Sequence, residues 1–170
     1  MQAASVKLYS LSYDDVRTYL AAALFVLGNI ALPQLAHLVP QGGMVLLPIY
    51  FFTLVGAYKY GWRVGLLTAA LSPVVNSLLF GMPSPAVLPA ILLKSVLLAA
   101  AAGFVASRSR RVTIPLLLAV VLFYQVLGTI GEWVMVGDFS IAVQDFRIGL
   151  PGMALQVIGG YAFIKYLIRK

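Results

Sequence analysis

A few ionisable side chains stand inside or beside long apolar stretches of this sequence, and they are the residues that could do chemistry. Lys94 lies within one stretch, Glu132 lies within another, and Arg147 precedes the last. A charge placed in hydrocarbon costs about 2.5–3.5 kcal/mol on insertion scales, so each needs a partner. Glu132 is the first candidate partner of Lys94. The pair is either a structural ion bridge between two helices or part of a site for a polar ligand.

Further polar residues accompany these charges. Arg147 suits bidentate contacts with a carboxylate or phosphate, or it is an interfacial residue whose head reaches water. Asp145 enters the same region or caps the following helix, and Trp133 is an interfacial aromatic or stacks on a ring. The other candidates for ligand contact, some of which could instead bond between helices, are Asn29, His37, Asn76, Gln125 and Gln144.

The sequence lacks the motifs of the common enzyme classes. It has no HExxH, GxSxG or Walker A pattern and no cysteine. His37 is the only histidine and has no carboxylate near it in sequence, so we expect no metal site. We therefore expect a protein that is not an enzyme, uses no cofactor and does not hydrolyse ATP itself. Active transport would need energy from a partner or an ion gradient.

The elements that must position these residues are membrane helices. Hydrophobic residues make up 62% of the 170 residues and charged residues only 10%, whereas soluble domains carry about 25% charged residues. The lipid bilayer is therefore the expected solvent, and we expect no nucleic-acid partner despite the net charge of +7. Ser12 and Asp15 form a possible capping box that would start a helix near residue 13. We predict an all-α, polytopic bundle in one domain, with six transmembrane helices at about 17–38, 44–58, 64–80, 86–106, 112–136 and 148–168.

Basic residues give this bundle a predicted orientation. Six spans put ten of the twelve basic residues on one side: Lys7, Arg17, Lys59, Arg63, Arg108, Arg110, Arg111, Lys165, Arg169 and Lys170. The positive-inside rule places that side, with both chain termini, in the cytoplasm of a prokaryotic-type cell membrane. The polar residues within the spans then fall in the outer half. We expect a cavity that opens outward and is closed below by apolar packing.

Several segments resemble one known family. They are 47–52 (LPIYFF), 60–67 (YGWRVGLL), 71–73 (LSP), 80–83 (FGMP), 93–95 (LKS), 132–133 (EW) and 144–152 (QDFRIGLPG). Together with the six predicted spans, the outward polar cavity and the lack of an ATPase motif, they resemble the substrate-binding S component of energy-coupling-factor (ECF) vitamin transporters. The likeness covers most of the chain.

The resemblance implies how such a protein would work. An S component binds a vitamin or related micronutrient near the outer surface, and the loops between spans 1–2, 3–4 and 5–6 close over it. Gly42 and Gly43 would suit a mobile first lid. The subunit then docks on a membrane coupling subunit and two cytosolic ATPase subunits. Family members often dock through an Ala-x-x-x-Ala pattern in span 1, whereas here Ala21, Ala22 and Ala23 are adjacent.

The ligand and the rival functions stay open. Lys94 and Arg147 favour a carboxylate or phosphate, and Glu132 favours an amine or hydroxyl, so a small amphipathic anion with a polar second end would suit both. The metal-binding branch of the family uses an N-terminal histidine arrangement that residues 1–4 (MQAA) lack. One alternative is a non-transport membrane scaffold. Another is a standalone proton-coupled carrier using Glu132, although carriers usually show an inverted repeat and none is evident.

Overall fold

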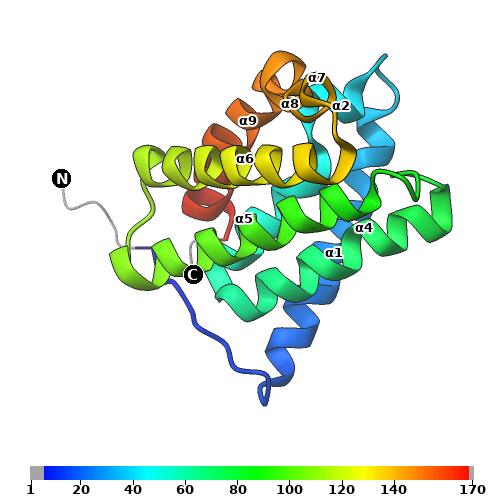
Figure 1. Ribbon diagram of the computed structural model, residues 1–170. Coiled ribbons are helices and arrows are strands. Elements are labelled where there is room, and N and C mark those ends of the chain that lie inside the picture. Colours follow the sequence, from blue (N-terminus) through cyan, green and yellow to red (C-terminus); the bar gives the residue numbers. More distant parts are fainter. Residues whose placement is uncertain (1–5, 169–170) are drawn as a thin grey trace.

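Four long helices dominate the computed structural model, which describes residues 6–168 and contains only helical elements within that range. They are α1 (Val16–Ala36), α4 (Trp62–Phe80), α5 (Leu88–Ser109) and α6 (Ile114–Val136). Helix α4 packs between α1 and α5, and α6 packs on the other side of α5 (Figure 1). Each is long and apolar enough to cross a membrane. The all-helical fold is thus confirmed, and the four helices indicate a membrane protein.

The predicted second span, 44–58, is not one helix. It is divided into α2 (Gly42–Leu46), the short 3₁₀ turn η1 (Pro48–Tyr50) and α3 (Phe51–Tyr60). The break falls at Leu47, which has a φ of +46°, and Pro48 then begins the next helical turn. Proline cannot donate the hydrogen bond that would continue a helix, but it suits a first turn. Helix α3 packs against α1, α4 and α5 and is buried along most of its length.

The last predicted span, 148–168, is a run of helical turns of changing pitch. After α7 (Phe139–Ala142) and α8 (Gln144–Ile148), the run consists of α9 (Leu150–Ala154), the wider π-helical turn η2 (Leu155–Gly159), α10 (Gly160–Ala162) and a second π-helical turn, η3 (Phe163–Leu167). Pro151 stands in the first turn of α9, as its type predicts. Arg169, Lys170 and residues 1–4, which the sequence analysis used, lie outside the described residues.

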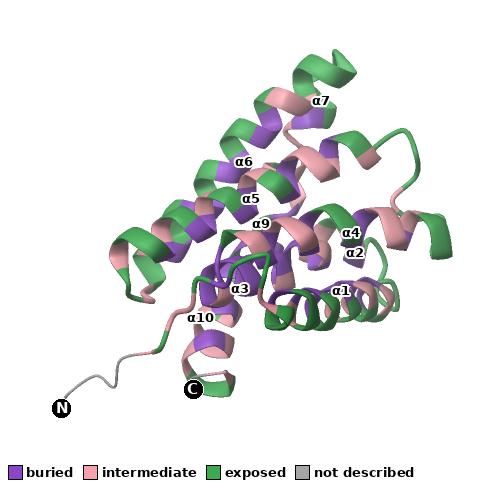
Figure 2. Ribbon diagram, turned by 90° about the horizontal axis from the view of Figure 1, so that it is seen from below, coloured by how far each residue is buried: buried purple, intermediate pink, exposed green. Residues whose placement is uncertain are grey.

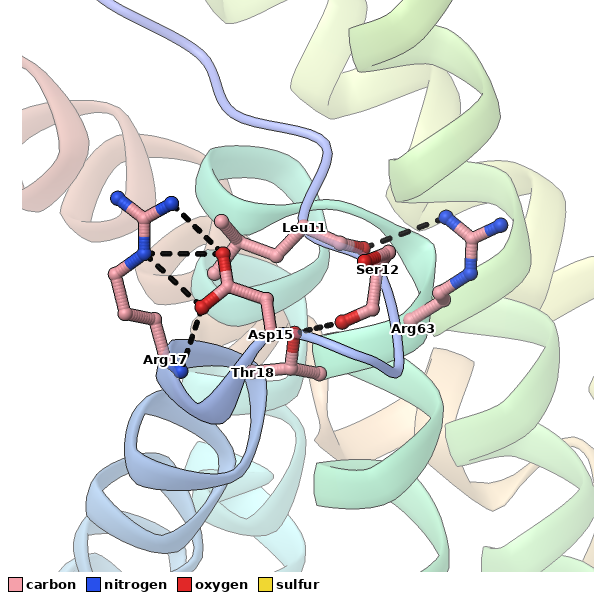
Figure 3. A network of polar contacts seen from close by, with 6 residues as sticks. All are labelled: Leu11, Ser12, Asp15, Arg17, Thr18 and Arg63. Atoms are coloured by element: carbon pink, nitrogen blue, oxygen red, sulfur yellow. Dashed lines mark hydrogen bonds and ion pairs between the residues drawn. The ribbon is translucent and has the colours of Figure 1, made fainter.

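The first long helix begins later than its predicted capping box. Asp15, not Ser12, is the N-cap of α1, and its carboxylate accepts a hydrogen bond of 2.9 Å from the main-chain nitrogen of Arg17 (Figure 3). The Arg17 guanidinium also binds this carboxylate, at 2.7 Å. Ser12 contributes through its main-chain oxygen, which accepts from the Thr18 hydroxyl at 2.5 Å. An aspartate satisfies free N–H groups at a helix start as well as a serine does, so the local sequence allowed either register.

The core lies along α3, where it packs against α4 and α5, and it continues along the buried face of α6. Leu54, Tyr58, Val64, Leu98 and Leu117 have no exposed surface. The outward faces of the long helices are exposed (Figure 2) and carry many exposed leucines and other apolar residues, which is the surface that lipid requires.

One face of α4 is a strip of small residues that allows close packing. Its members Gly65, Ala69, Ser72 and Asn76 are all buried. A Cβ on Gly65 would collide with Ala57 of α3, so the two backbones can approach only because Gly65 has no side chain.

The two ends of the bundle are built differently. At one end, which we call the loop end, lie three longer connections: 37–50 with α2, 81–87, and 137–149 with α7 and α8. At the other, the turn end, α3 and α4 are joined at Gly61, and α5 and α6 are joined by 110–113. Figure 1 shows the α4–α5 connection and the α5–α6 connection on opposite sides of the bundle.

Candidate functional site

Three charged side chains meet at the loop end. The Lys94 ammonium lies 2.5 Å from a carboxylate oxygen of Glu132 and 2.7 Å from one of Asp145. Their side chains are only 4%, 13% and 18% exposed. Lys94 comes from α5, Glu132 from the last two turns of α6, and Asp145 from α8. The predicted partnership of Lys94 and Glu132 is confirmed, and Asp145 is a second partner.

A glycine makes room for this charged triad of Lys94, Glu132 and Asp145. Gly128 stands one turn before Glu132 on α6. A Cβ at Gly128 would lie 2.5 Å from Cγ of Lys94, which is too close for any real side chain. The lysine stem therefore runs directly over the α6 backbone to reach Glu132. Gly128 and Glu132 lie on the same face of α6, and the Lys94 side chain packs against this face.

The triad lines a cavity of about 220 Å³, which we call the charged cavity. Its other walls come from α2, η1, α5, α7 and α8. The buried ring of Tyr50 forms part of the wall, and the side-chain nitrogen of Gln144 contacts the sulfur of Met44 at 2.7 Å across it. The lining residues are Gly43, Met44, Leu47, Ile49, Tyr50, Val87, Ala90, Ile91, Lys94, Glu132, Ile141, Gln144 and Asp145.

A second cavity, the apolar cavity, adjoins the first and holds about 390 Å³. Ligand cavities commonly hold about 300–1,000 Å³ and are mostly apolar. The two cavities share five lining residues, Gly43, Met44, Ile49, Val87 and Ile91. The apolar cavity is further lined by Pro33, His37, Gln41, Pro48, Asn76, Met82 and Pro83. All three connections of the loop end contribute to these walls.

Asn76 places an unsatisfied acceptor beside the apolar cavity. Its amide nitrogen donates to the main-chain oxygens of Asn29 and Ser72, both at 2.9 Å. Its side-chain oxygen is buried and has no hydrogen-bond partner among the described residues. Leaving such an atom without a partner costs about 1–3 kcal/mol, so it is a place where a ligand donor would be favourable.

Asn29 lies behind Asn76 and is fully satisfied. Its side-chain nitrogen donates to the hydroxyls of Thr53 at 3.0 Å and Ser72 at 3.2 Å. Its side-chain oxygen accepts from the Phe52 main-chain nitrogen at 3.0 Å. That nitrogen is in the first turn of α3, where a helix supplies no acceptor. Asn29 therefore joins α1, α3 and α4, and it does not line either cavity.

The remaining predicted site residues are distributed around the two cavities. His37 and Gly43 are wall residues, and Gly43 belongs to both cavities. Gly42 is buried against the main chain of Ala36. Gln125 is fully buried in the middle of α6, and neither polar atom of its side chain has a partner in the described part of the chain.

Two predicted contact residues point elsewhere. Trp133 is 47% exposed, and its ring meets the edge of Phe139 at a centroid distance of 5.4 Å. Arg147 is exposed on α8 and lines neither cavity.

The proposed docking alanines are not equivalent. Ala22 is in the core, Ala21 is half-buried and Ala23 is exposed. Of these three alanines, Ala23 is the one whose side chain is exposed to a partner helix.

Sequence reasoning missed several residues of the site. Asp145 was considered only as a helix cap or a nearby group, and Tyr50 was not among the candidate site residues. The remaining missed wall residues, among them Met44, Ile49 and Ile91, are ordinary apolar residues whose type carries no signal. For Asp145, the only signal was its position in the sequence, just before the last apolar stretch and at the same predicted end of the bundle as Glu132.

Comparison with known proteins adds no relative to this picture. No protein-family model, no curated protein and no solved structure matches the chain.

Proposed function

We propose that this protein is the substrate-binding S component of an ECF-type importer, which captures a small vitamin-like metabolite at the outer face of a cell membrane. A membrane coupling subunit and two cytosolic ATPase subunits would then drive delivery to the cytoplasm. The observation that carries the proposal is the charged triad, because it is buried and yet lines a cavity. Ionisable groups inside a membrane protein usually mark a substrate path.

In this proposal the chain crosses the membrane six times. The four long helices provide four spans, and the other two are the 48–60 segment, comprising η1 and α3, and the helical run from Leu150 to Leu167. Both segments pack against the long helices. The burial of α3 supports this assignment, because a short helix enclosed by protein does not need to span the full lipid thickness on its own.

Charge supports an orientation with the loop end outside. The turn end carries Lys59, Arg63, Arg108, Arg110 and Arg111 at the ends of α3, α4 and α5. Basic residues cluster on the cytoplasmic side of membrane proteins. The cavities at the loop end would therefore face the outside, and α2, the 81–87 connection and α7–α8 would close over a bound molecule.

One observation favours a second function. Two carboxylates share one lysine, so a proton could be carried on Glu132 or Asp145, as in a standalone proton-coupled carrier. A non-transport scaffold is the third possibility, in which the triad only joins α5, α6 and α8.

Ligand extraction tests the proposal. The full chain, purified in mild detergent, should release a small metabolite that mass spectrometry identifies, or should be stabilised by members of a vitamin panel. Glu132→Ala should abolish that stabilisation, and Lys165→Ala, which removes a charged group that lines neither cavity, should not. A chain that releases nothing and responds to no compound would contradict a binding subunit. Co-purification with an ATPase module distinguishes an ECF subunit from a standalone carrier.

A further inference from the structure

The charged cavity has an excess of negative charge. Lys94 supplies one positive charge, and Glu132 and Asp145 supply two negative charges when ionised. Of the other charged groups near the loop end, Arg147 is exposed on α8, and Asp138 is exposed and caps α7 by accepting from the Ser140 main-chain nitrogen at 2.8 Å. Neither lines the cavity. One negative charge is left for a ligand or a proton to balance.

The geometry also determines which partner Lys94 can accept. Its ammonium already contacts both carboxylates, at 2.5 and 2.7 Å. An anionic ligand would have to displace one of them or add a third negative charge to the same buried site. A cationic nitrogen would instead balance the site and could bind the carboxylate oxygens that Lys94 does not reach. Charge-assisted hydrogen bonds of this kind are about twice as strong as neutral ones.

Building on the proposed function, we propose that the ligand carries a cationic nitrogen, such as an ammonium group, that binds between Glu132 and Asp145 while its apolar body fills the apolar cavity. This differs from the anion expected from the sequence, which depended on Lys94 and Arg147 as free positive charges. Lys94 is occupied and Arg147 faces away from the cavity.

Two further features of the cavities agree with this ligand. The Tyr50 ring lies in the wall beside the carboxylates, and aromatic rings attract cations. The unpartnered oxygen of Asn76, in the wall of the apolar cavity, is also an acceptor. The Tyr50 ring would therefore favour a positive charge, and the Asn76 oxygen would favour a hydrogen-bond donor. The buried side-chain donors without a partner in the described chain are on Ser95, Gln125, Thr129 and Gln156, and these residues line neither cavity.

A matched set of probes tests the ligand charge on the full chain in detergent. Phenethylamine, 2-phenylethanol and 3-phenylpropionate share one aromatic body and carry a positive, a neutral and a negative head. Thermal stabilisation and isothermal calorimetry should rank the amine first. We expect the amine to bind at least about tenfold more tightly than the alcohol, a difference of about 1.4 kcal/mol. We expect the carboxylate to bind most weakly.

Size-matched variants test where the cation binds. Glu132→Gln and Asp145→Asn each leave one carboxylate for Lys94, so each should reduce amine affinity by about tenfold or more and leave the alcohol unaffected. Asp138→Asn removes the same charge from the loop end outside the cavity and should leave amine affinity within about twofold. Gel-filtration profiles identify any variant that does not fold, and the wild-type probe series stands independently of the variants.

The outcomes separate two failures. If the alcohol binds as tightly as the amine, a proton balances the site and the proposal is wrong. If the carboxylate binds most tightly, or no amine binds, it is also wrong. In those cases the proposed function still stands if a neutral or anionic metabolite is extracted from the purified chain, and it fails only if no compound of any charge is found.

Discussion

The loop end and the turn end both bury polar side chains, but they satisfy them differently. At the turn end, the Tyr58 hydroxyl donates to the Arg111 carbonyl at 2.7 Å and the Arg63 guanidinium donates to the Leu11 carbonyl at 3.3 Å. The Lys59 ammonium donates to the Lys7 carbonyl. Segment 6–15 is thereby held across the ends of α3 and α4, and Figure 3 shows part of this network.

Toward the loop end, several buried polar side chains have atoms without a hydrogen-bond partner among the described residues. The residues whose buried side-chain atoms lack partners in the described part of the chain are Asn76, Ser95, Gln125, Thr129 and Gln156. All of them lie in the middle of a helix or toward the loop end. A turn-end cavity of about 440 Å³ exists as well, but its only ionisable side chains are those of Tyr9 and Arg110. Cavity volume alone therefore does not separate the ends, whereas unsatisfied polar groups do.

The difference teaches how to separate structural from functional polar groups in this protein. A group whose hydrogen bonds are complete within the chain contributes to stability, and its loss should reduce stability alone. A polar group that lines a cavity and has an atom without a hydrogen-bond partner is available to a ligand. Its removal should weaken ligand binding more than it lowers stability. The four predictions below test this distinction.

The largest effect should come from removing the lysine of the triad. Lys94→Met leaves two buried carboxylates together without a counter-charge, and breaking a buried ion pair in this way costs about 3–5 kcal/mol. We expect a large fall in the thermal unfolding temperature in detergent. The triple variant Lys94→Met, Glu132→Gln, Asp145→Asn removes every charge and should recover part of the loss. An unfolding temperature like that of Lys165→Met would show that the triad is not buried as described.

Asn29 and Asn76 offer the sharpest pairwise test. Asn29→Leu removes the hydrogen bonds of the Asn29 side chain to α3 and α4 and leaves the Phe52 nitrogen unpaired, so we expect it to cost about 1–3 kcal/mol of stability. Asn76→Leu removes the side-chain nitrogen, which donates to two main-chain oxygens within helices, and the side-chain oxygen, which has no partner among the described residues. It should cost less stability but weaken ligand binding. Denaturation and binding measured on both variants check this, and the reverse order would contradict the comparison.

A smaller effect is expected at the turn end. Tyr58→Phe removes the hydroxyl that donates to the Arg111 carbonyl, so stability should fall by about 1 kcal/mol. Ligand affinity should not change, because Tyr58 lines neither of the loop-end cavities. Tyr19→Phe, on an exposed face of α1, is the matched control with no expected loss. A change in ligand affinity in Tyr58→Phe would show that the two ends are coupled.

The smallest effect concerns the cap of α1. Hydrogen bonds from Arg17 lower the pKa of the Asp15 carboxyl below its usual 3.8. Because its pKa is lowered by folding, the ionised Asp15 carboxylate stabilises the folded state above pH 3.8. This contribution is lost as the pH falls through the pKa that Asp15 has in the folded protein. The stability difference between the wild type and Asp15→Asn should therefore shrink as the pH is lowered past 3.8. Asp14→Asn, one residue away from the cap, should show no such convergence in thermal melts.

Sequence reasoning recovered the long helices because their apolar length is unmistakable, with ends within three residues of the observed ones. It missed the break at Leu47, because nothing in the leucine itself demands a positive φ and Pro48 is compatible with a span. Sequence reasoning paired Lys94 with Glu132 only because both residues lie in the outer half of their predicted spans. It did not place Asp145 on the same lysine, because α8 folds back through turns whose direction depends on tertiary packing. Arg147 and Asp145 lie two residues apart on α8, so they cannot both face the cavity.

The two tryptophans of the chain divide between the two ends, which makes the comparison visible by spectroscopy. Trp62 stands at the turn end with the Arg63 guanidinium 4.8 Å from its ring, and Trp133 stands at the loop end next to Glu132. Trp62→Phe leaves Trp133 as the single tryptophan, at the loop end, and Trp133→Phe leaves Trp62, at the turn end. The tryptophan fluorescence of each variant, excited where tyrosine does not absorb, therefore reports one end without an added label.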